Sequence, residues 1–137
     1  MFKQLIVFVS VLSGSGFVQA DDPMNTKKCQ SEPLITEIKF LEKFVPDMES
    51  GKKTATTRRG IRCVKAGQKL VATTPKGQPL GELMVLRAYM LRFNEITTEL
   101  AKAENTTIEG LQRGLISIYG PDIKNQDLTA IHFIWIE

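Results

Sequence analysis

Gly51-Lys-Lys-Thr-Ala-Thr-Thr-Arg58 is the densest polar stretch of the chain, and it lies between a short predicted helix and a run of predicted strands. Its threonines are β-branched, which favours an extended strand. Because side chains alternate along a strand, Thr54, Thr56 and Arg58 would share one face, with Lys53 at the strand entry, and the two residues between them would face the other way. An ammonium, a guanidinium and hydroxyls would then converge on one small pocket. Composition alone favours a plainer alternative, an exposed edge strand on which lysine and arginine discourage aggregation.

A short helix precedes this stretch. Apolar residues recur at helical spacing over residues 40–45, and Pro46 suits the first turn of a helix. Gly51 suits the position just after a helix end. Residues 51–53 are therefore predicted to form the turn that leads into the strand.

The remaining sequence predicts several strands and two further helices. Strands are predicted at 34–40, 54–58, 68–74, 80–93 and 128–136, and helices at 97–103 and 106–118. Thr106 and Glu109 have the spacing of a capping box at the start of the second helix. The last strand is apolar on both faces, which predicts a central buried position. This order predicts an α+β domain with a small curled sheet or barrel and packed helices.

The first twenty residues have the order of a secretory signal. A lysine precedes an apolar run at 5–12, and Val18-Gln-Ala20 offers small residues at the two positions that signal peptidase reads. The run is too short for a membrane span, which needs about 20 residues. We therefore expect a signal peptide at 1–20, a flexible lead-in at 21–36 and one domain at 37–137, with no membrane contact once the leader is removed.

Two locations follow from two possible start sites. A genuine leader predicts a periplasmic or secreted protein in which Cys29 and Cys63 can pair. A start at Met24 would instead give a cytoplasmic protein with two free thiols.

Length and composition narrow the function classes. The chain has 137 residues, which suits one domain. Its net charge of +3, from 18 Lys and Arg against 15 Asp and Glu, is below the excess usual in duplex-binding proteins, although a nucleoside or a short RNA remains compatible. Two cysteines, one histidine (His132) and no CxxC or HxxxH spacing argue against a metal-dependent mechanism.

Glu104 is the second candidate for chemistry, because it lies between the two predicted helices. Taken alone, a carboxylate at a helix end is ordinarily solvated and signals nothing. His132 is expected to be a satisfied core residue. Tyr119 and Trp135 are able to stack on a base, although packing is the commoner role.

Two motifs together resemble the ASCH domain family. The first is Phe40-Leu-Glu-Lys-Phe44 followed by Met48-Glu-Ser-Gly-Lys-Lys-Thr-Ala-Thr-Thr-Arg58, and the second is Leu100-Ala-Lys-Ala-Glu-Asn-Thr-Thr-Ile-Glu109 followed by Ile118-Tyr-Gly120. Within that family, the similarity is to the single-domain bacterial branch known as N4-acetylcytidine amidohydrolase, over roughly 37–137. The two motifs at this separation are more specific than either alone.

The resemblance implies a PUA-like β-barrel and an enzyme that deacetylates N4-acetylcytidine, or related N4-acylated cytosine nucleosides, without a cofactor. It implies that Lys53 is the base, Thr56 the nucleophile and Glu104 the acid, with Arg58 in the substrate-binding region. Thr56 would form an acyl-enzyme after neutral Lys53 takes its proton, and Glu104 would protonate the leaving amine. Arg58 or a backbone N–H would stabilise the oxyanion.

The chain departs from the family pattern in its leader and in a longer segment at 122–127, which we expect at the pocket rim. Two alternatives remain open. One is an RNA-binding module with an open basic groove and exposed aromatic rings. The other is a ribonuclease that uses Lys53 and Arg58 to stabilise phosphate charge and has no need of Thr56. The sequence leaves open whether the protein is a monomer or a homodimer.

Overall fold

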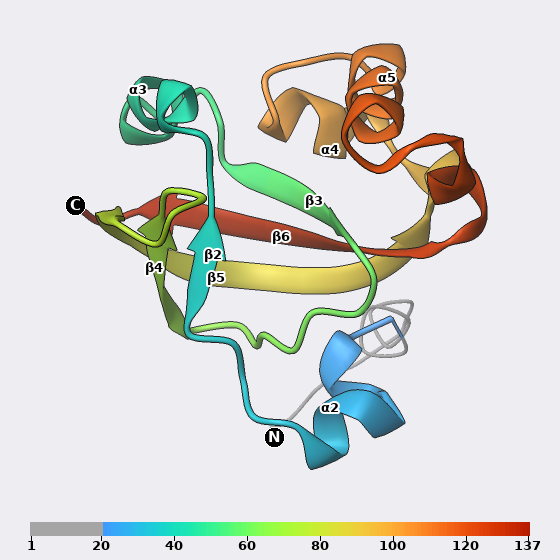
Figure 1. Ribbon diagram of the computed structural model, residues 1–137, viewed down its shortest axis with the longest axis horizontal. Coiled ribbons are helices and arrows are strands. Elements are labelled where there is room, and N and C mark those ends of the chain that lie inside the picture. The colour runs from blue at the N-terminus through green and yellow to red at the C-terminus, as the bar shows by residue number, and fades with distance from the viewer. Residues whose placement is uncertain (1–20) are drawn as a thin grey trace, which may run out of the picture.

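A computed structural model describes residues 21–137, which form a curled five-stranded sheet with helices packed around it (Figure 1). The predicted signal peptide lies outside the described residues. The strands are β2 (Glu37–Lys39), β3 (Ala55–Arg59), β4 (Lys69–Thr73), β5 (Pro79–Arg92) and β6 (Asp127–Trp135). The α-helices are α2 (Lys27–Ser31), α3 (Val45–Glu49), α4 (Thr98–Ala103) and α5 (Ile108–Tyr119). Short 3₁₀ segments are η1 (Pro23–Asn25), η2 (Glu42–Phe44), η3 (Phe93–Glu95) and η4 (Pro121–Asn125).

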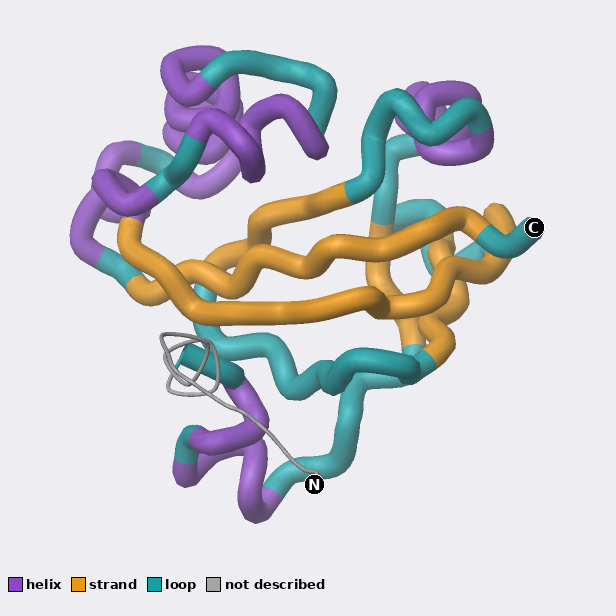
Figure 2. Tube along the Cα trace, turned by 180° about the vertical axis from the view of Figure 1, so that it is seen from behind, coloured by secondary structure: helices purple, strands orange, loops and turns teal. Residues whose placement is uncertain are grey.

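The sheet is a half-barrel with two free edges. Its order is β2-β4-β5-β6-β3, in which β2 and β4 are parallel and the other pairs antiparallel. The long strand β5 carries the curvature, because its pairing with β6 shifts between Val85 and Arg87 and a bulge there bends the strand. Seen from behind, β5 and β6 run across the whole molecule (Figure 2). The two edge strands, β2 and β3, border the open side of the half-barrel.

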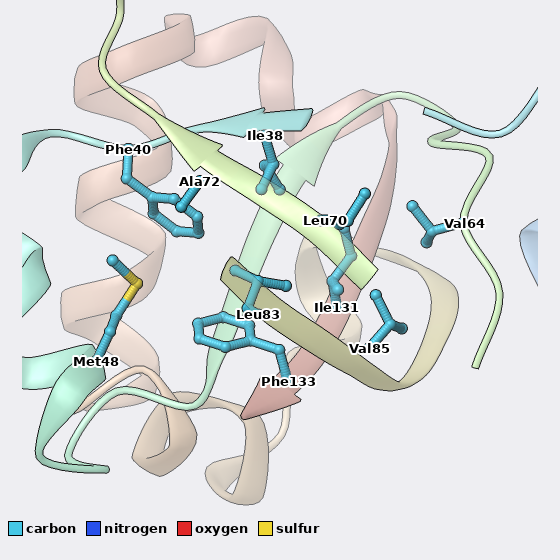
Figure 3. Close-up of a cluster of buried hydrophobic side chains, with 10 residues drawn as sticks. All are labelled: Ile38, Phe40, Met48, Val64, Leu70, Ala72, Leu83, Val85, Ile131 and Phe133. Carbon is cyan, nitrogen blue, oxygen red and sulfur yellow. The ribbon is translucent and has the colours of Figure 1, made fainter. Parts of the chain in front are cut away.

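Strand β6 joins two hydrophobic clusters, which explains why its sequence is apolar on both faces. Ile131 and Phe133 point into the cluster inside the curled sheet, where Phe133 meets Phe40 edge to face at 6.0 Å between ring centroids (Figure 3). Leu128 and Ala130 point to the opposite face, where α4, α5 and η4 pack. The prediction of a central buried strand is confirmed.

Several predicted elements differ in their bounds. The strand predicted at 34–40 is only three residues long, Glu37–Lys39. Helix α5 is capped by Thr107 and not by Thr106, because the Thr107 hydroxyl accepts from the Gly110 N–H at 3.0 Å. The Thr106 N–H instead bonds to the Ala101 carbonyl and closes the end of α4. The other strands and helices agree with the predictions to within two residues.

The lead-in at 21–36, predicted to be flexible, contains ordered structure. Residues of η1 and α2 form helical turns on the side of the sheet opposite α4 and α5 (Figure 1). Cys29 of α2 forms a disulfide with Cys63, which lies in the segment between β3 and β4. The covalent link and the burial of Pro23 attach this arm to the domain, whereas hydrophobic periodicity gives no sign of it.

No helix within residues 21–137 is both long enough and apolar enough to cross a membrane.

Candidate active site

A pocket of about 420 Å³ lies along the free edge of β3. Phe40, Phe44 and Asp47 line one side of it, from the segment that runs through η2 into α3. Leu111, Leu115 and other residues of α5 line the opposite side. Figure 1 shows α3 and the α4–α5 pair above the sheet, with β3 between them. The pocket therefore occupies the open side of the half-barrel.

The backbone of β3 points alternately at β6 and at this pocket. Phe133 N–H donates to the Thr54 carbonyl at 2.9 Å, and Gly60 N–H donates to the Asp127 carbonyl at 2.7 Å. With the antiparallel register between them, even-numbered residues of β3 bond to β6. The N–H and C=O groups of Ala55 and Thr57 consequently face the free edge.

Lys53 enters the pocket from the turn that follows α3. Gly51 has a φ of +83°, a conformation that suits glycine, and the Lys53 N–H then bonds to the Asp47 carbonyl at 2.9 Å. The ammonium donates to the Ala55 carbonyl at 3.0 Å and to Glu104 Oε1 at 3.3 Å. It also lies 5.2 Å from the centre of the Phe44 ring. Only 9% of the Lys53 side chain is exposed.

Glu104 is delivered by the end of α4. Its N–H closes the helix on the Leu100 and Ala101 carbonyls, and Asn105 then reverses the chain with a φ of +62°. The Thr54 N–H bonds to the Ala103 carbonyl at 2.6 Å, which joins the start of β3 to this helix end. The Glu104 side chain is only 8% exposed, so it is not the solvated carboxylate that its sequence position alone suggests.

Both oxygens of the Glu104 carboxylate are held by hydrogen bonds. Lys53 donates to Oε1, and the Thr57 hydroxyl donates to Oε2 at 2.5 Å. Thr57 is itself buried, with 5% of its surface exposed. An ion pair of this kind, taken out of water, depends on such additional hydrogen bonds for compensation.

Burial moves the pKa values of the pair toward each other. Desolvation lowers the pKa of Lys53, the Glu104 charge and hydrogen bond oppose this, and the Arg58 charge adds to the lowering. Desolvation raises the pKa of Glu104, while the Lys53 charge and the Thr57 hydrogen bond oppose the rise. The free-energy gap between the ion pair and the neutral pair is therefore smaller than in water.

Thr56 and Arg58 lie on the other face of β3. Arg58 Nε donates to Thr56 Oγ1 at 2.9 Å, and Arg58 Nη2 donates to the Lys39 carbonyl at 2.7 Å. The guanidinium also stacks 4.8 Å from the centre of the Phe40 ring. Because Lys39 ends β2, this one side chain connects the two edge strands across the opening of the half-barrel.

All four residues singled out from the sequence, Lys53, Thr56, Arg58 and Glu104, line this one pocket. The alternation predicted for the strand is also correct, with Thr56 and Arg58 on one face. Among the described residues, however, no hydrogen bond joins the Lys53 ammonium to the Thr56 hydroxyl.

Thr57 is the residue that sequence reasoning missed. Alternation assigned it to the face away from Thr56, which is where it lies. The pocket wraps around the free edge of the strand and so receives side chains from both faces. No local sequence signal reveals this, because it depends on α4 bringing Glu104 to the far face.

Among the other candidates, His132 and Trp135 do not line the pocket, whereas Tyr119 does. His132 is half-buried and hydrogen-bonds to the Tyr89 hydroxyl at 3.1 Å, so it is satisfied as expected. Tyr119 lies at the pocket margin and Trp135 packs on the inner cluster. The segment at 122–127, expected at the rim, does not line the pocket, since Ile123 is buried beneath α5 in the outer cluster. Within residues 21–137, no group of three His, Cys, Asp or Glu is arranged to hold a metal ion.

Comparison with named proteins identifies the family. The chain is 34% identical over 102 residues to an N(4)-acetylcytidine amidohydrolase of Shewanella sp. strain ANA-3, covering 73% of this chain and 90% of the relative. The protein of that name from Shewanella oneidensis is also 34% identical over 102 residues, with 95% of its length covered. The chain belongs to the N(4)-acetylcytidine amidohydrolase family. No family model matches the chain.

The fold of this family member is that of an ASCH domain. The solved ASCH domain of Lactobacillus crispatus superposes with a TM-score of 0.62 and covers 88% of this chain, with 89% of its own length matched. Its sequence identity is only 12%, so this likeness concerns the fold alone. The predicted α+β architecture with a PUA-like curled sheet is confirmed.

Replacing Lys53 by methionine is expected to destabilise the fold by about 3 kcal/mol at neutral pH, because the buried Glu104 carboxylate loses its partner. Burial would then raise the pKa of Glu104 further. The folded chain would hold a proton that the unfolded chain loses, so stability falls as pH rises and recovers in acid. Urea denaturation of Lys53→Met at several pH values measures this.

Lys52→Met is the matched control, because Lys52 is exposed and its loss should change stability by no more than about 0.5 kcal/mol. Equal stability of the two variants at neutral pH would contradict the buried ion pair.

Proposed function

We propose that this protein hydrolyses N4-acetylcytidine, or related N4-acylated cytosine nucleosides, to the free nucleoside and a carboxylate. The names of its relatives support this reaction. The observation that carries the proposal is the buried Lys53–Glu104 pair in the same pocket as Thr56. The pocket volume of about 420 Å³ also falls within the range of about 300–1,000 Å³ common for small-molecule sites.

In the proposed mechanism, the Thr56 oxygen attacks the acyl carbon of the substrate. Lys53, as a neutral amine, takes the hydroxyl proton while the new C–O bond forms. The C–N bond then breaks, and Glu104 gives its proton to the leaving N4 amine. The products of this first half are the free cytosine nucleoside and an ester on Thr56, with Lys53 charged and Glu104 ionised.

Water then hydrolyses the ester, and the two residues exchange roles: Glu104 accepts a proton and Lys53 donates one. The Glu104 carboxylate takes a proton from the attacking water, and the Lys53 ammonium returns a proton to the departing Thr56 oxygen. The carboxylic acid is released, and both groups regain their starting forms. The pair is neutral before acylation, ionic in the acyl-enzyme and neutral again after deacylation. The cycle therefore needs no additional proton from solvent.

The starting form, with neutral Lys53 and protonated Glu104, is accessible because it contains the same number of protons as the ion pair. Moving one proton from the Lys53 ammonium to the Glu104 carboxylate converts charged partners into neutral ones. Lys53 Nζ and Glu104 Oε1 are 3.3 Å apart, so the proton can pass directly between them after a small shortening of this distance. Burial lowers the pKa of Lys53 and raises the pKa of Glu104, and both changes favour the neutral pair.

Arg58 prepares the nucleophile in this scheme. It donates to Thr56 Oγ1, so the threonine proton is left to point toward an acceptor such as Lys53. A cation beside the hydroxyl also stabilises the negative charge that develops on the oxygen during attack. The Thr57 N–H faces the free strand edge and is available as a donor to the substrate oxyanion.

The buried Lys53–Glu104 pair favours the hydrolase over the two alternatives. An RNA-docking module needs an open basic surface with exposed aromatic rings. Here Lys53 is buried and its charge is engaged by Glu104, which also disfavours its use as a phosphate clamp. A ribonuclease would retain activity without the Thr56 hydroxyl, so replacement of that residue separates the chemistries.

Thr56→Ala is expected to reduce kcat for N4-acetylcytidine hydrolysis by about three orders of magnitude or more, because it removes the proposed nucleophile. Cytidine and acetate are measured by chromatography after incubation with the purified protein. Thr54→Ala is the control, since Thr54 does not line the pocket. Turnover by Thr56→Ala comparable to that of Thr54→Ala would rule out the assignment.

The pH dependence of kcat/KM should be bell-shaped. At low pH both groups of the pair are protonated and Lys53 cannot accept a proton, whereas at high pH the pair lacks the proton that the leaving amine requires. Arg58 lowers the pKa of both Lys53 and Glu104. Arg58→Met should therefore move both limbs of the bell to higher pH.

Arg59→Met is the matched control, because Arg59 is exposed and stacks on Tyr119. An acid limb that stays in place in an Arg58→Met protein that still binds substrate would remove Arg58 from this role.

We further propose that the protein works in an oxidising compartment. The leader-like pattern of residues 1–20 and the Cys29–Cys63 disulfide support export, since such bonds persist mainly outside the reducing cytosol. Expression of the full sequence should yield a periplasmic or secreted chain that begins at Asp21 and contains no free thiol. N-terminal sequencing and thiol titration test this, and a cytosolic chain that begins at Met24 would refute it.

A further inference from the structure

We propose that Thr57 is a positioning residue that holds the Glu104 carboxylate and controls when it gives and takes its proton. The proposal rests on the proposed hydrolase function and assigns that site a further residue. It starts from the direct hydrogen bond of 2.5 Å from Thr57 Oγ1 to Glu104 Oε2. Both side chains are largely buried, with 5% of Thr57 and 8% of the Glu104 side chain exposed.

The two consecutive threonines have separate partners because they lie on opposite faces of β3. Thr56 lies beside Arg58 on the face that covers the inner cluster. Thr57 lies on the face toward α4, where Glu104 ends the helix. Because β3 is an edge strand, side chains from both of its faces line the pocket along its free edge. The strand thereby presents a nucleophile on one face and a group that orients the acid on the other.

The hydroxyl can remain bonded to Glu104 in both protonation states. It donates its hydrogen to Oε2 of the ionised carboxylate, and it still donates to Oε2 as the carbonyl oxygen when the acid proton lies on Oε1, beside Lys53. Lys53 occupies the other carboxylate oxygen throughout. Glu104 is therefore fixed at both oxygens, and only the location of the proton changes during the cycle.

Donation to the carboxylate stabilises its charged form and limits the rise in pKa that burial causes. This matters for the second half of the proposed reaction, in which ionised Glu104 must accept a proton from water. A buried carboxyl without this donor would tend to stay neutral. Thr57 thus keeps Glu104 competent both as an acid and as a base.

The other charged and titratable groups around Glu104 do not replace this contribution. Lys53 and Arg58 act on it from the β3 side, and Asp47 of α3 acts in turn on Lys53. Tyr89 of β5 is close enough for the Glu104 charge to raise its pKa. Helix α5 contributes apolar side chains such as Leu111 and Leu115 to the pocket wall. Thr57 is the neutral donor on Oε2.

The test compares Thr57→Val, which keeps the shape but removes the donor, with Thr57→Ser, which keeps the donor. In Thr57→Val the acid limb of kcat/KM on N4-acetylcytidine should move up by about one to two pH units, and kcat should fall. Thr57→Ser should restore the native limb. Thr54→Val controls for the loss of a threonine that lies just before β3 and outside the pocket. A Thr57→Val profile that coincides with that of the native protein would overturn the proposal.

A second measurement needs no substrate. Carboxyl absorption in infrared difference spectra, assigned to Glu104 by its loss in Glu104→Gln, should titrate about one to two pH units higher in Thr57→Val. If this shift is present but the native protein does not hydrolyse N4-acetylcytidine, the proposed function is wrong, while the role of Thr57 in positioning Glu104 is supported. If Thr57→Val does not fold, Thr57→Cys, a weaker donor of similar size, should give a smaller shift in the same direction, and no shift there would contradict the proposal.

Mass spectrometry of the acyl-enzyme distinguishes positioning from nucleophilic attack. An acyl group on Thr56 in the native protein and in Thr57→Ser is the expected result. An acyl group on Thr57, retained in Thr56→Ala, would make Thr57 the nucleophile with Glu104 as its base and would overturn the positioning role.

Discussion

The buried ion pair between Lys53 and Glu104 is the interaction on which the rest of the site depends. Two charges removed from water are stable only when every remaining hydrogen-bonding position is filled. Here the lysine also caps the Ala55 carbonyl, and the carboxylate also accepts from Thr57. The turn at Gly51 and the end of α4 bring the two charges together, and the bond from Thr54 N–H to the Ala103 carbonyl keeps those two elements in contact.

The site is built on the free edge of a half-barrel. An edge strand with unpaired backbone groups ordinarily invites pairing with another chain. In this protein the edge of β3 is covered by α5 on one side and by the segment through η2 and α3 on the other, and the space left between them is the pocket. Arg58 spans the opening to the Lys39 carbonyl. The same unpaired edge that would favour aggregation on a bare sheet becomes a row of polar groups that face a pocket.

Much of this architecture could be predicted from local patterns. Hydrophobic alternation located the long strands, and glycine, proline and threonine located the ends of several helices. The identity of α5's cap was wrong because Thr106 and Thr107 both satisfy the local rule, and only the competing bond from Thr106 N–H to Ala101 decides between them. The sequence allowed Cys29 to pair with Cys63, 34 positions away, but the helical turns around Cys29 were missed because segments this short leave no periodic signal.

The sequence by itself determined the strand at 54–58, its alternation, and the residue types able to carry out acyl transfer: Lys53, Thr56, Arg58 and Glu104. The strand and its alternation follow from local patterns, whereas the roles of these residues are implied by the resemblance to the ASCH family. Tertiary structure alone decided that Glu104 is buried against Lys53, that Arg58 lies beside Thr56, and that Thr57 belongs to the site. The physical reason is that desolvation and hydrogen bonding depend on which groups meet in space. Packing brings α4 to the edge of β3 across about fifty residues of chain, a separation that no local pattern encodes.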